Sequence, residues 1–263
     1  MKTFVLGVGA QKAGTTWLWK LLCTSDFAQT SKKEYHFLNT LEARHSKHTI
    51  EAEDSIGGIQ LTNPSNFETC IKDYVFFFKK YLENSSKFYT GEITPAYAML
   101  KSKTFLTTRE ILLENGLNPR IIFIMRNPVD RIISHFSLMM KRNNLTFPSQ
   151  QAFEKALIEF SSLDRVISRT QYKKTLDVLS NVFDPREIYV GLYEEIFTSE
   201  KISELSHFLK VTLNQNFHST KVNESQHTFE VSRQAREIIS ESYQATYLHM
   251  NNLFPKTKEL WSL

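Results

Sequence analysis

A glycine-rich stretch near the N-terminus constrains the fold more than any other part of the chain. Residues 9–16 (GAQKAGTT) follow a short apolar run, residues 4–8, of the kind found in strands buried on both faces. Apolar residues at helical spacing continue over residues 14–23. A strand, a glycine loop and a helix N-terminus in this order predict a phosphate-binding loop, because free N–H groups and the helix dipole point at the anion.

The lysine of this loop stands in an unusual position. A nucleotide kinase or ATPase has a lysine directly after the second glycine, whereas this chain has Thr15 after Gly14 and its lysine earlier, at Lys12. We therefore expect the loop to hold a phosphate without hydrolysing ATP in the way of those enzymes. Lys12 would lie beside the bridging oxygen of a phosphate-type donor, where negative charge develops as a group leaves. Thr15 and Thr16 would donate hydrogen bonds to the same phosphate.

A second anion site is predicted where another apolar run ends at Arg126. Ligand sites of α/β sheets form at the carboxyl ends of strands. Asn127 and Pro128 are suited to cap and begin a helix, with Ser134 about two turns along it. An arginine fork and a hydroxyl form a good phosphate clamp, although a structural ion pair would also explain Arg126. We expect Arg131 to be solvated or salt-bridged.

The order of the predicted elements indicates the fold class. A third strand is expected over residues 187–193, and strands that alternate with helical segments predict an α/β fold. We expect a three-layer sandwich around a central parallel sheet with a P-loop-like phosphate site, in a single domain spanning residues 1–263. Further helices are expected over residues 67–83, 104–115, 150–160, 170–182, 199–209 and 231–249, and loops over 40–66 and 212–230.

Composition and charge limit the classes of ligand and partner that the chain can be expected to bind. The net charge of +4 is mild, but residues 101–150 hold eight Lys and Arg against three acids, which suits an anionic ligand. The basic residues lack the dense stripe of a nucleic-acid-binding surface, so no nucleic acid is expected. No apolar stretch approaches the roughly 20 residues of a membrane span. The N-terminus lacks the cleavage pattern of a signal peptide, and we expect a cytoplasmic protein with reduced cysteines.

Several segments together resemble one enzyme family. Residues 11–18 (QKAGTTWL) look like the 5′-phosphosulfate loop of the sulfotransferases that use 3′-phosphoadenosine 5′-phosphosulfate (PAPS). Residues 126–136 (RNPVDRIISHF) look like their 3′-phosphate motif. Residues 33–37 (KEYHF) and 91–97 (GEITPAY) resemble segments of the heparan-sulfate-type members, and residues 183–195 match the later strand region. The resemblance covers nearly the whole chain in the right order.

This resemblance implies a PAPS-dependent sulfotransferase that releases 3′-phosphoadenosine 5′-phosphate (PAP) and needs no metal. Glu34 becomes the candidate general base, since a carboxylate suits this role if burial raises its pKa. His36 either orients Glu34, contacts the acceptor or is itself the base. The implied donor-binding residues are Gln11, Lys12, Ala13, Gly14, Thr15, Thr16, Trp17, Arg126, Ser134, Tyr193 and Lys221.

The acceptor side is implied less directly. Lys33, Glu92, Thr94 and Tyr97 are expected to line it, although Pro95 stiffens this turn and makes a purely structural role equally compatible. The acceptor is expected to offer a hydroxyl or an amine and to be a saccharide or another small metabolite. The oligomeric state is left open.

Two other function classes remain open from the sequence. A P-loop kinase or NTPase would place a Mg²⁺-holding aspartate after the second strand, where this chain has Arg126 and Asn127. A non-catalytic nucleotide- or glycan-binding protein of the same fold would keep the phosphate sites without turnover.

Overall fold

The computed structural model describes residues 2–46, 54–220 and 230–262. Its centre is a parallel sheet of four strands in the order β4-β1-β5-β6. This arrangement confirms the predicted α/β fold with a central parallel sheet. The strands are β1 (Lys2–Gly9), β4 (Tyr89–Ile93), β5 (Leu117–Met125) and β6 (Ile188–Leu192).

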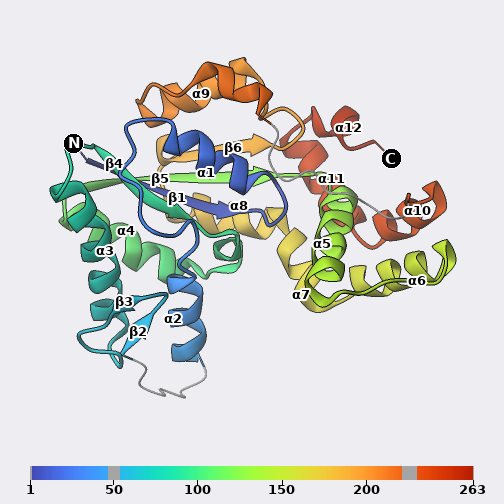
Figure 1. Cartoon of the computed structure of the whole chain (residues 1–263), viewed down its shortest axis with the longest axis horizontal. Coiled ribbons are helices and arrows are strands. Elements are labelled where there is room, and N and C mark those ends of the chain that lie inside the picture. The colour runs from blue at the N-terminus through green and yellow to red at the C-terminus, as the bar shows by residue number, and fades with distance from the viewer. Residues whose placement is uncertain (1, 47–53, 221–229, 263) are drawn as a thin grey trace.

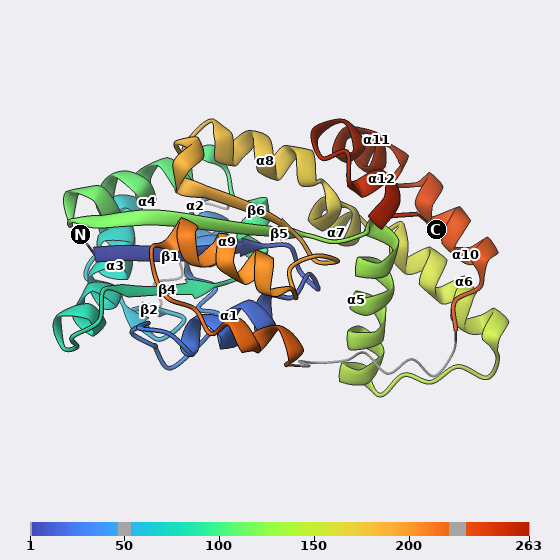
Figure 2. The same cartoon turned by 90° about the horizontal axis from the view of Figure 1, so that it is seen from above.

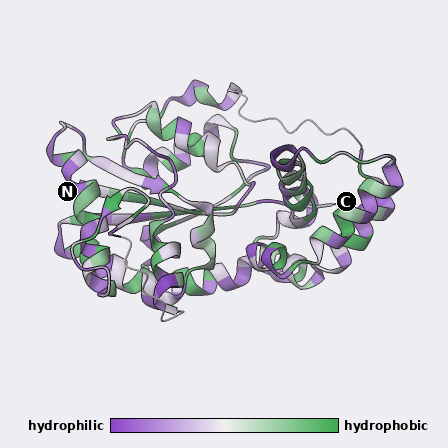
Figure 3. Cartoon of the chain, turned by 60° about the horizontal axis from the view of Figure 1, so that its bottom comes forward, coloured by the Kyte–Doolittle hydropathy of each residue, from purple (hydrophilic) through white to green (hydrophobic). Residues whose placement is uncertain are grey.

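Helices cover both faces of this sheet, as Figure 1 shows. On one side lie α1 (Thr15–Cys23) and α9 (Ser199–Leu209). On the other side lie α3 (Phe67–Glu83), α4 (Ser102–Glu114) and α8 (Tyr172–Ser180). Hydrophobic and hydrophilic residues alternate along these outer helices, which is the pattern expected of helices that bury one side against a sheet (Figure 3).

Six further helices gather beyond the carboxyl ends of the strands (Figure 2). These helices are α5 (Pro128–Asn143), α6 (Gln150–Ser161), α7 (Asp164–Ile167), α10 (Arg233–Glu241), α11 (Gln244–Leu253) and α12 (Thr257–Leu260). Helices α5, α6, α7 and α10 pack around an apolar cluster of their own, to which Val129, Phe136, Leu157 and Ile239 belong. No helix in the described part of the chain has the length and apolar character that a membrane crossing requires.

Strand β4 depends on a glycine. Gly91 has a φ of +148°, and a Cβ built on it would lie 1.9 Å from the backbone oxygen of Val5 in β1. Any side chain at residue 91 would therefore push β4 away from β1. The short 3-10 helix η1 (Pro95–Met99) follows directly and packs against β1.

Three predicted segments differ from the structure. The loop expected over residues 212–230 contains the 3-10 helix η4 (Gln215–Ser219) in its described part. The loop expected over residues 40–66 is wrong in part, because it contains most of α2 (Phe37–Ser46) and a small hairpin of β2 (Ser55–Ile56) and β3 (Ile59–Gln60). The single helix expected over residues 231–249 is also wrong. It is divided into α10 and α11 by a turn at Ser242 and Tyr243, whose hydroxyl donates to the Ser161 carbonyl of another helix.

Candidate active site

The glycine loop connects β1 to α1, as the sequence predicts. Gly14 precedes the helix with a φ of 79°, in the left-handed region, and its carbonyl accepts the first helical hydrogen bond from the Leu18 N–H at 3.0 Å. A Cβ at residue 14 would lie 3.2 Å from the ring of Tyr193. The N–H groups of the first turn have no partner within the helix, so this end of α1 can receive an anion.

Arg126 brings the two predicted anion sites together. It follows the last residue of β5, and its Nη1 donates to the backbone oxygen of Lys12 at 3.0 Å. Its guanidinium also lies over the ring of Tyr193, 4.2 Å from the ring centre. The Tyr172 hydroxyl donates to the Arg126 carbonyl at 2.8 Å and so fixes the backbone at the strand end.

The loop is strongly electropositive. Burial lowers the pKa of Lys12, and the positive charges of Arg126 and Arg142 lower it further. The Nε of Arg126 and the Oε1 of Gln11 are both buried without a hydrogen-bond partner among the described residues. Partly buried cations and unsatisfied polar atoms at a strand end fit a ligand with several anionic oxygens.

A polar network, which the sequence did not reveal, holds Arg126 in position. The Glu194 carboxylate accepts from the Asn127 N–H at 2.8 Å and from the Trp261 indole at 3.1 Å, and burial raises the pKa of Glu194. The Asn127 side chain caps α5 and accepts from the Tyr247 hydroxyl at 2.8 Å. Glu194 comes directly after a predicted strand, so the strand-end rule that selected Arg126 would also have selected it.

Ser134 and Arg131 lie on α5, the helix that begins right after Arg126 and Asn127. Ser134 is buried. Arg131 corrects an expectation, because it is buried and has no salt bridge with any residue that the structure describes. Its side chain is 0% exposed, and its Nη2 donates to the Val166 carbonyl at 3.2 Å.

The candidate base lies next to the first turn of α1. Residues 27–36 run along the outer edge of β4, and the Ile93 N–H donates to the Lys33 carbonyl at 2.9 Å. The Nζ of Lys33 lies 2.5 Å from Oε1 of Glu34 and donates to Oγ1 of Thr15 at 3.3 Å. On the other side, Nε2 of His36 lies 3.2 Å from Oε2 of Glu34. The predicted base, its neighbouring cation and the loop helix therefore meet at one place.

Glu92, Thr94 and Tyr97 lie in the interior, with side chains 0% exposed. The Glu92 carboxylate accepts hydrogen bonds from the hydroxyls of Thr94 at 2.5 Å, Tyr97 at 2.7 Å and Tyr74 at 2.6 Å, and from the Tyr35 N–H at 2.8 Å. These bonds tie β4 to the segment that carries Glu34. In this arrangement the three side chains offer no exposed surface to an acceptor.

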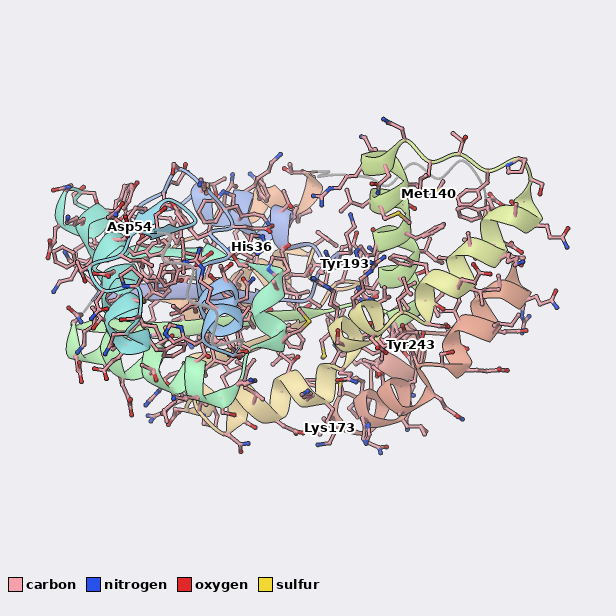
Figure 4. All side chains as sticks on the ribbon, turned by 90° about the horizontal axis from the view of Figure 1, so that it is seen from below. His36, Asp54, Met140, Lys173, Tyr193 and Tyr243 are labelled. Atoms are coloured by element: carbon pink, nitrogen blue, oxygen red, sulfur yellow. The ribbon has the colours of Figure 1, made fainter. Side chains whose placement is uncertain are left out.

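The other predicted donor-binding residues lie on or beside the loop. Ala13 is buried, while Gln11 and Thr16 are partly exposed. Trp17 is buried, with ring centres of Phe197 and Phe217 at 5.0 and 5.7 Å from its own. Lys221 lies outside the described residues. Figure 4 shows His36 on one side of Tyr193 and Met140, on α5, on the other.

No group of three or more His, Cys, Asp or Glu side chains in the described ranges is arranged to hold a metal ion. The charged side chains that act on Lys12 of the loop are the cations Arg126 and Arg142. The position after Gly14 holds Thr15, and the end of β5 holds Arg126 and Asn127. The arrangement therefore lacks the lysine and the Mg²⁺-binding aspartate that a kinase or NTPase would place there.

Comparisons with known proteins agree with this geometry. A family model described as "Sulfotransferase domain" matches residues 2–255. A sulfotransferase from Alicyclobacillus acidocaldarius has a similar structure, with a TM-score of 0.61 and 18% identity over 96% of each chain. The sulfotransferase domain of the Synechococcus PCC 7002 olefin synthase gives a TM-score of 0.50 and 12% identity over 92% of this chain and 94% of that one. No curated protein sequence matches.

Proposed function

This chain belongs to the sulfotransferase domain family, and we propose that its sulfuryl donor is PAPS and its acceptor a hydroxyl or amine of a small metabolite or saccharide. Family membership supports a sulfotransfer reaction.

One observation carries the choice of donor. The Arg126 guanidinium donates to the Lys12 backbone, so the loop at the start of α1 and the clamp at the start of α5 adjoin each other. A ligand with a phosphate at each end of one nucleoside suits two adjoining anion sites. The loop N–H groups, Lys12, Thr15 and Thr16 would hold its 5′ end. Arg126 and Ser134 would hold its 3′-phosphate, since a guanidinium and a hydroxyl are suited to phosphate oxygens.

PAPS supplies the sulfuryl group, and the protein supplies position, charge and a proton acceptor. The acceptor oxygen or nitrogen forms a bond to sulfur as the bond between sulfur and the bridging phosphate oxygen breaks. The electron pair of the broken bond stays on the 5′-phosphate of PAP, where Lys12 and the loop N–H groups stabilise it. The proton of the acceptor passes to Glu34. Because the donor is already activated, positioning of the reactants supplies much of the rate.

The contacts of Glu34 support its role as the base. Its two carboxylate oxygens face different partners, with Lys33 on one and His36 on the other. Lys33 also reaches Thr15, which links the base to the helix that would hold the departing phosphate. The side chain of His36 is 50% exposed. In this mechanism His36 orients Glu34 and relays the proton that Glu34 has accepted to solvent.

Turnover with PAPS tests the proposal. The protein is incubated with PAPS and a panel of hydroxyl and amine acceptors, and PAP release is measured. We expect acceptor-dependent release, and its absence together with absence of nucleotide binding would overturn the proposal. Thermal stabilisation separates the kinase alternative, because PAP should raise Tm whereas ATP with Mg²⁺ should not. A purely binding protein would show the stabilisation without any turnover.

A further inference from the structure

A group of basic side chains extends beyond the residues assigned to the donor. We call Arg131, His135, Arg142, Arg165 and Arg169 the basic cluster. Arg131, His135 and Arg142 are four and seven residues apart on α5, which puts them on one face of that helix. Arg165 lies on α7, and Arg169 on the 3-10 helix η2 (Ser168–Thr170) that continues it.

These two parts of the basic cluster face each other. The Nη2 of Arg131 donates to the Val166 carbonyl and so joins α5 to α7. The pKa of His135 is lowered to about 3. Burial is the largest cause, followed by the positive charges of Arg131, Arg169, Lys12 and Arg165. His135 is therefore neutral near pH 7 and surrounded by cations that come from three separate segments of the chain.

The basic cluster has no acidic partner within the described ranges. Elsewhere in the chain several arginines are paired with acids, for example Arg109 with Glu187 at 2.9 Å and Arg236 with Asp130 at 2.9 Å. In the basic cluster, by contrast, Nε and Nη1 of Arg131 and Nδ1 of His135 are buried without any hydrogen-bond partner among described residues. Buried charges in proteins are normally paired, so this concentration of cations fits an external anion.

The position of the basic cluster favours the acceptor over the donor. The donor phosphates already have Lys12, Arg126, the loop N–H groups and Ser134. Helix η2, which carries Arg169, packs against η1. The Tyr97 hydroxyl of η1 accepts from the Leu38 N–H at 3.2 Å, two residues after His36. Helix α2, which follows His36, also packs against η1, so η1 joins the part of the basic cluster that carries Arg169 to the segment that carries the candidate base.

We propose that the acceptor carries an anionic group of its own, such as a carboxylate or a phosphate, bound by Arg165 and Arg169 while its hydroxyl or amine faces Glu34. This inference rests on the proposed sulfotransfer from PAPS. A guanidinium fork matches the planar oxygens of a carboxylate. Arg165 is exposed and Arg169 is partly exposed, so both can engage a carboxylate without the cost of burying a new charge. Arg142, exposed at the end of α5, extends the positive field toward solvent.

Matched acceptor pairs test this inference. One pair is 4-hydroxyphenylacetate and its methyl ester, and another is an alkyl glucuronide and the corresponding alkyl glucoside. We expect kcat/KM to favour the charged member of the productive pair by at least about tenfold, as one charge-assisted hydrogen bond would give. Binding to the PAP-loaded protein, measured by calorimetry, should show the same preference, so that the test does not depend on turnover alone.

The double variant Arg165→Gln/Arg169→Gln should bring this preference close to one while PAP binds with unchanged affinity. Arg186→Gln is the matched control, because Arg186 is 88% exposed and pairs with Asp184 away from the cluster. Three results would overturn the inference: no preference in the wild type, a preference that survives in the double variant, or a loss of PAP affinity as large as the loss of preference. Absence of both PAP binding and transfer would instead overturn the proposed function, and this inference with it.

Discussion

Two glutamates on neighbouring segments, Glu34 and Glu92, have opposite surroundings. Glu34 is one-third exposed, and its oxygens contact Lys33 and His36, both of which are partly open to solvent. Glu92 is fully buried, and it accepts hydrogen bonds from three hydroxyls and one N–H. A carboxylate that takes a proton from a ligand must be accessible to that ligand, and the surroundings of Glu34 meet this requirement while those of Glu92 do not. Four internal donors make Glu92 part of the framework that holds Glu34.

The largest effect is expected for Glu34→Gln. Removal of the proton acceptor should lower kcat by about three orders of magnitude, within the range of general-base catalysis. PAP affinity and Tm should stay at their wild-type values, because the amide keeps the shape of the side chain. Glu68→Gln is the control, since Glu68 is 62% exposed and pairs with Lys72 on α3. Wild-type turnover in Glu34→Gln would exclude Glu34 as the base and favour His36.

Glu92→Ala should have its main effect on stability, whereas Glu34→Gln should have its main effect on kcat. Four buried donors would lose their acceptor, and we expect the free energy of unfolding to fall by about 3 kcal/mol or more, as measured by urea denaturation. Tyr74→Phe removes only one donor and should cost about 1 kcal/mol. If Glu92→Ala were as stable as the wild type but inactive, Glu92 would belong to the catalytic machinery instead.

Lys33→Met should give a smaller effect on activity. Lys33 joins Glu34 to Thr15, and loss of these contacts should lower kcat about tenfold, equivalent to one charge-assisted hydrogen bond. The neighbouring Lys32→Met is a matched control, because Lys32 donates to the Gly57 carbonyl. Equal kcat values for the two variants in steady-state assays would contradict the assigned link.

The smallest effect concerns the pH dependence of stability. Burial raises the pKa of Glu92, and the hydrogen bonds from Thr94, Tyr74, Tyr35 and Tyr97 oppose this only in part. The native state therefore holds the Glu92 proton to higher pH than the unfolded state does. The stability from this group is complete below the unfolded pKa and is lost as pH rises through the folded one.

Relative to Glu92→Gln, the wild type should therefore lose stability as pH rises above about 4.5, by at most about 1.4 kcal/mol per pH unit. Urea denaturation of both proteins between about pH 4 and 8 measures this difference, because a buried carboxyl with a raised pKa titrates within roughly that range. A difference that grows in favour of the wild type with rising pH would show that the folded pKa is lowered.

The glycine loop could be predicted from the sequence because the residues that form it are neighbours in the chain. The apolar strand, Gly14 and the hydroxyls that follow it lie within one short segment, and the same is true of Arg126, Asn127 and Pro128. Strand β4 was missed because Gly91 and Glu92 break its apolar pattern, whereas its stability comes from pairing with β1. Helix α2 was missed for a similar reason, since only its first turns are buried.

The contacts between distant segments could not be predicted from the sequence. Glu194 supports Asn127 across 67 positions in the chain, and the basic cluster joins α5 to α7 and η2. Arg131 illustrates the limit, because its sequence neighbours suggest a surface residue while the packing of α7 buries it completely. The functional assignments of residues such as Glu34, Ser134 and Lys221 stay predictions.

Calorimetric titration with PAP and with adenosine 5′-phosphate tests the central claim most directly. These nucleotides differ only in the 3′-phosphate, which we assign to Arg126 and Ser134. The account predicts that PAP binds at least about tenfold more tightly, and that Arg126→Gln removes this preference. Equal affinities for the two nucleotides, or tighter binding of ATP with Mg²⁺ than of PAP, would contradict the account.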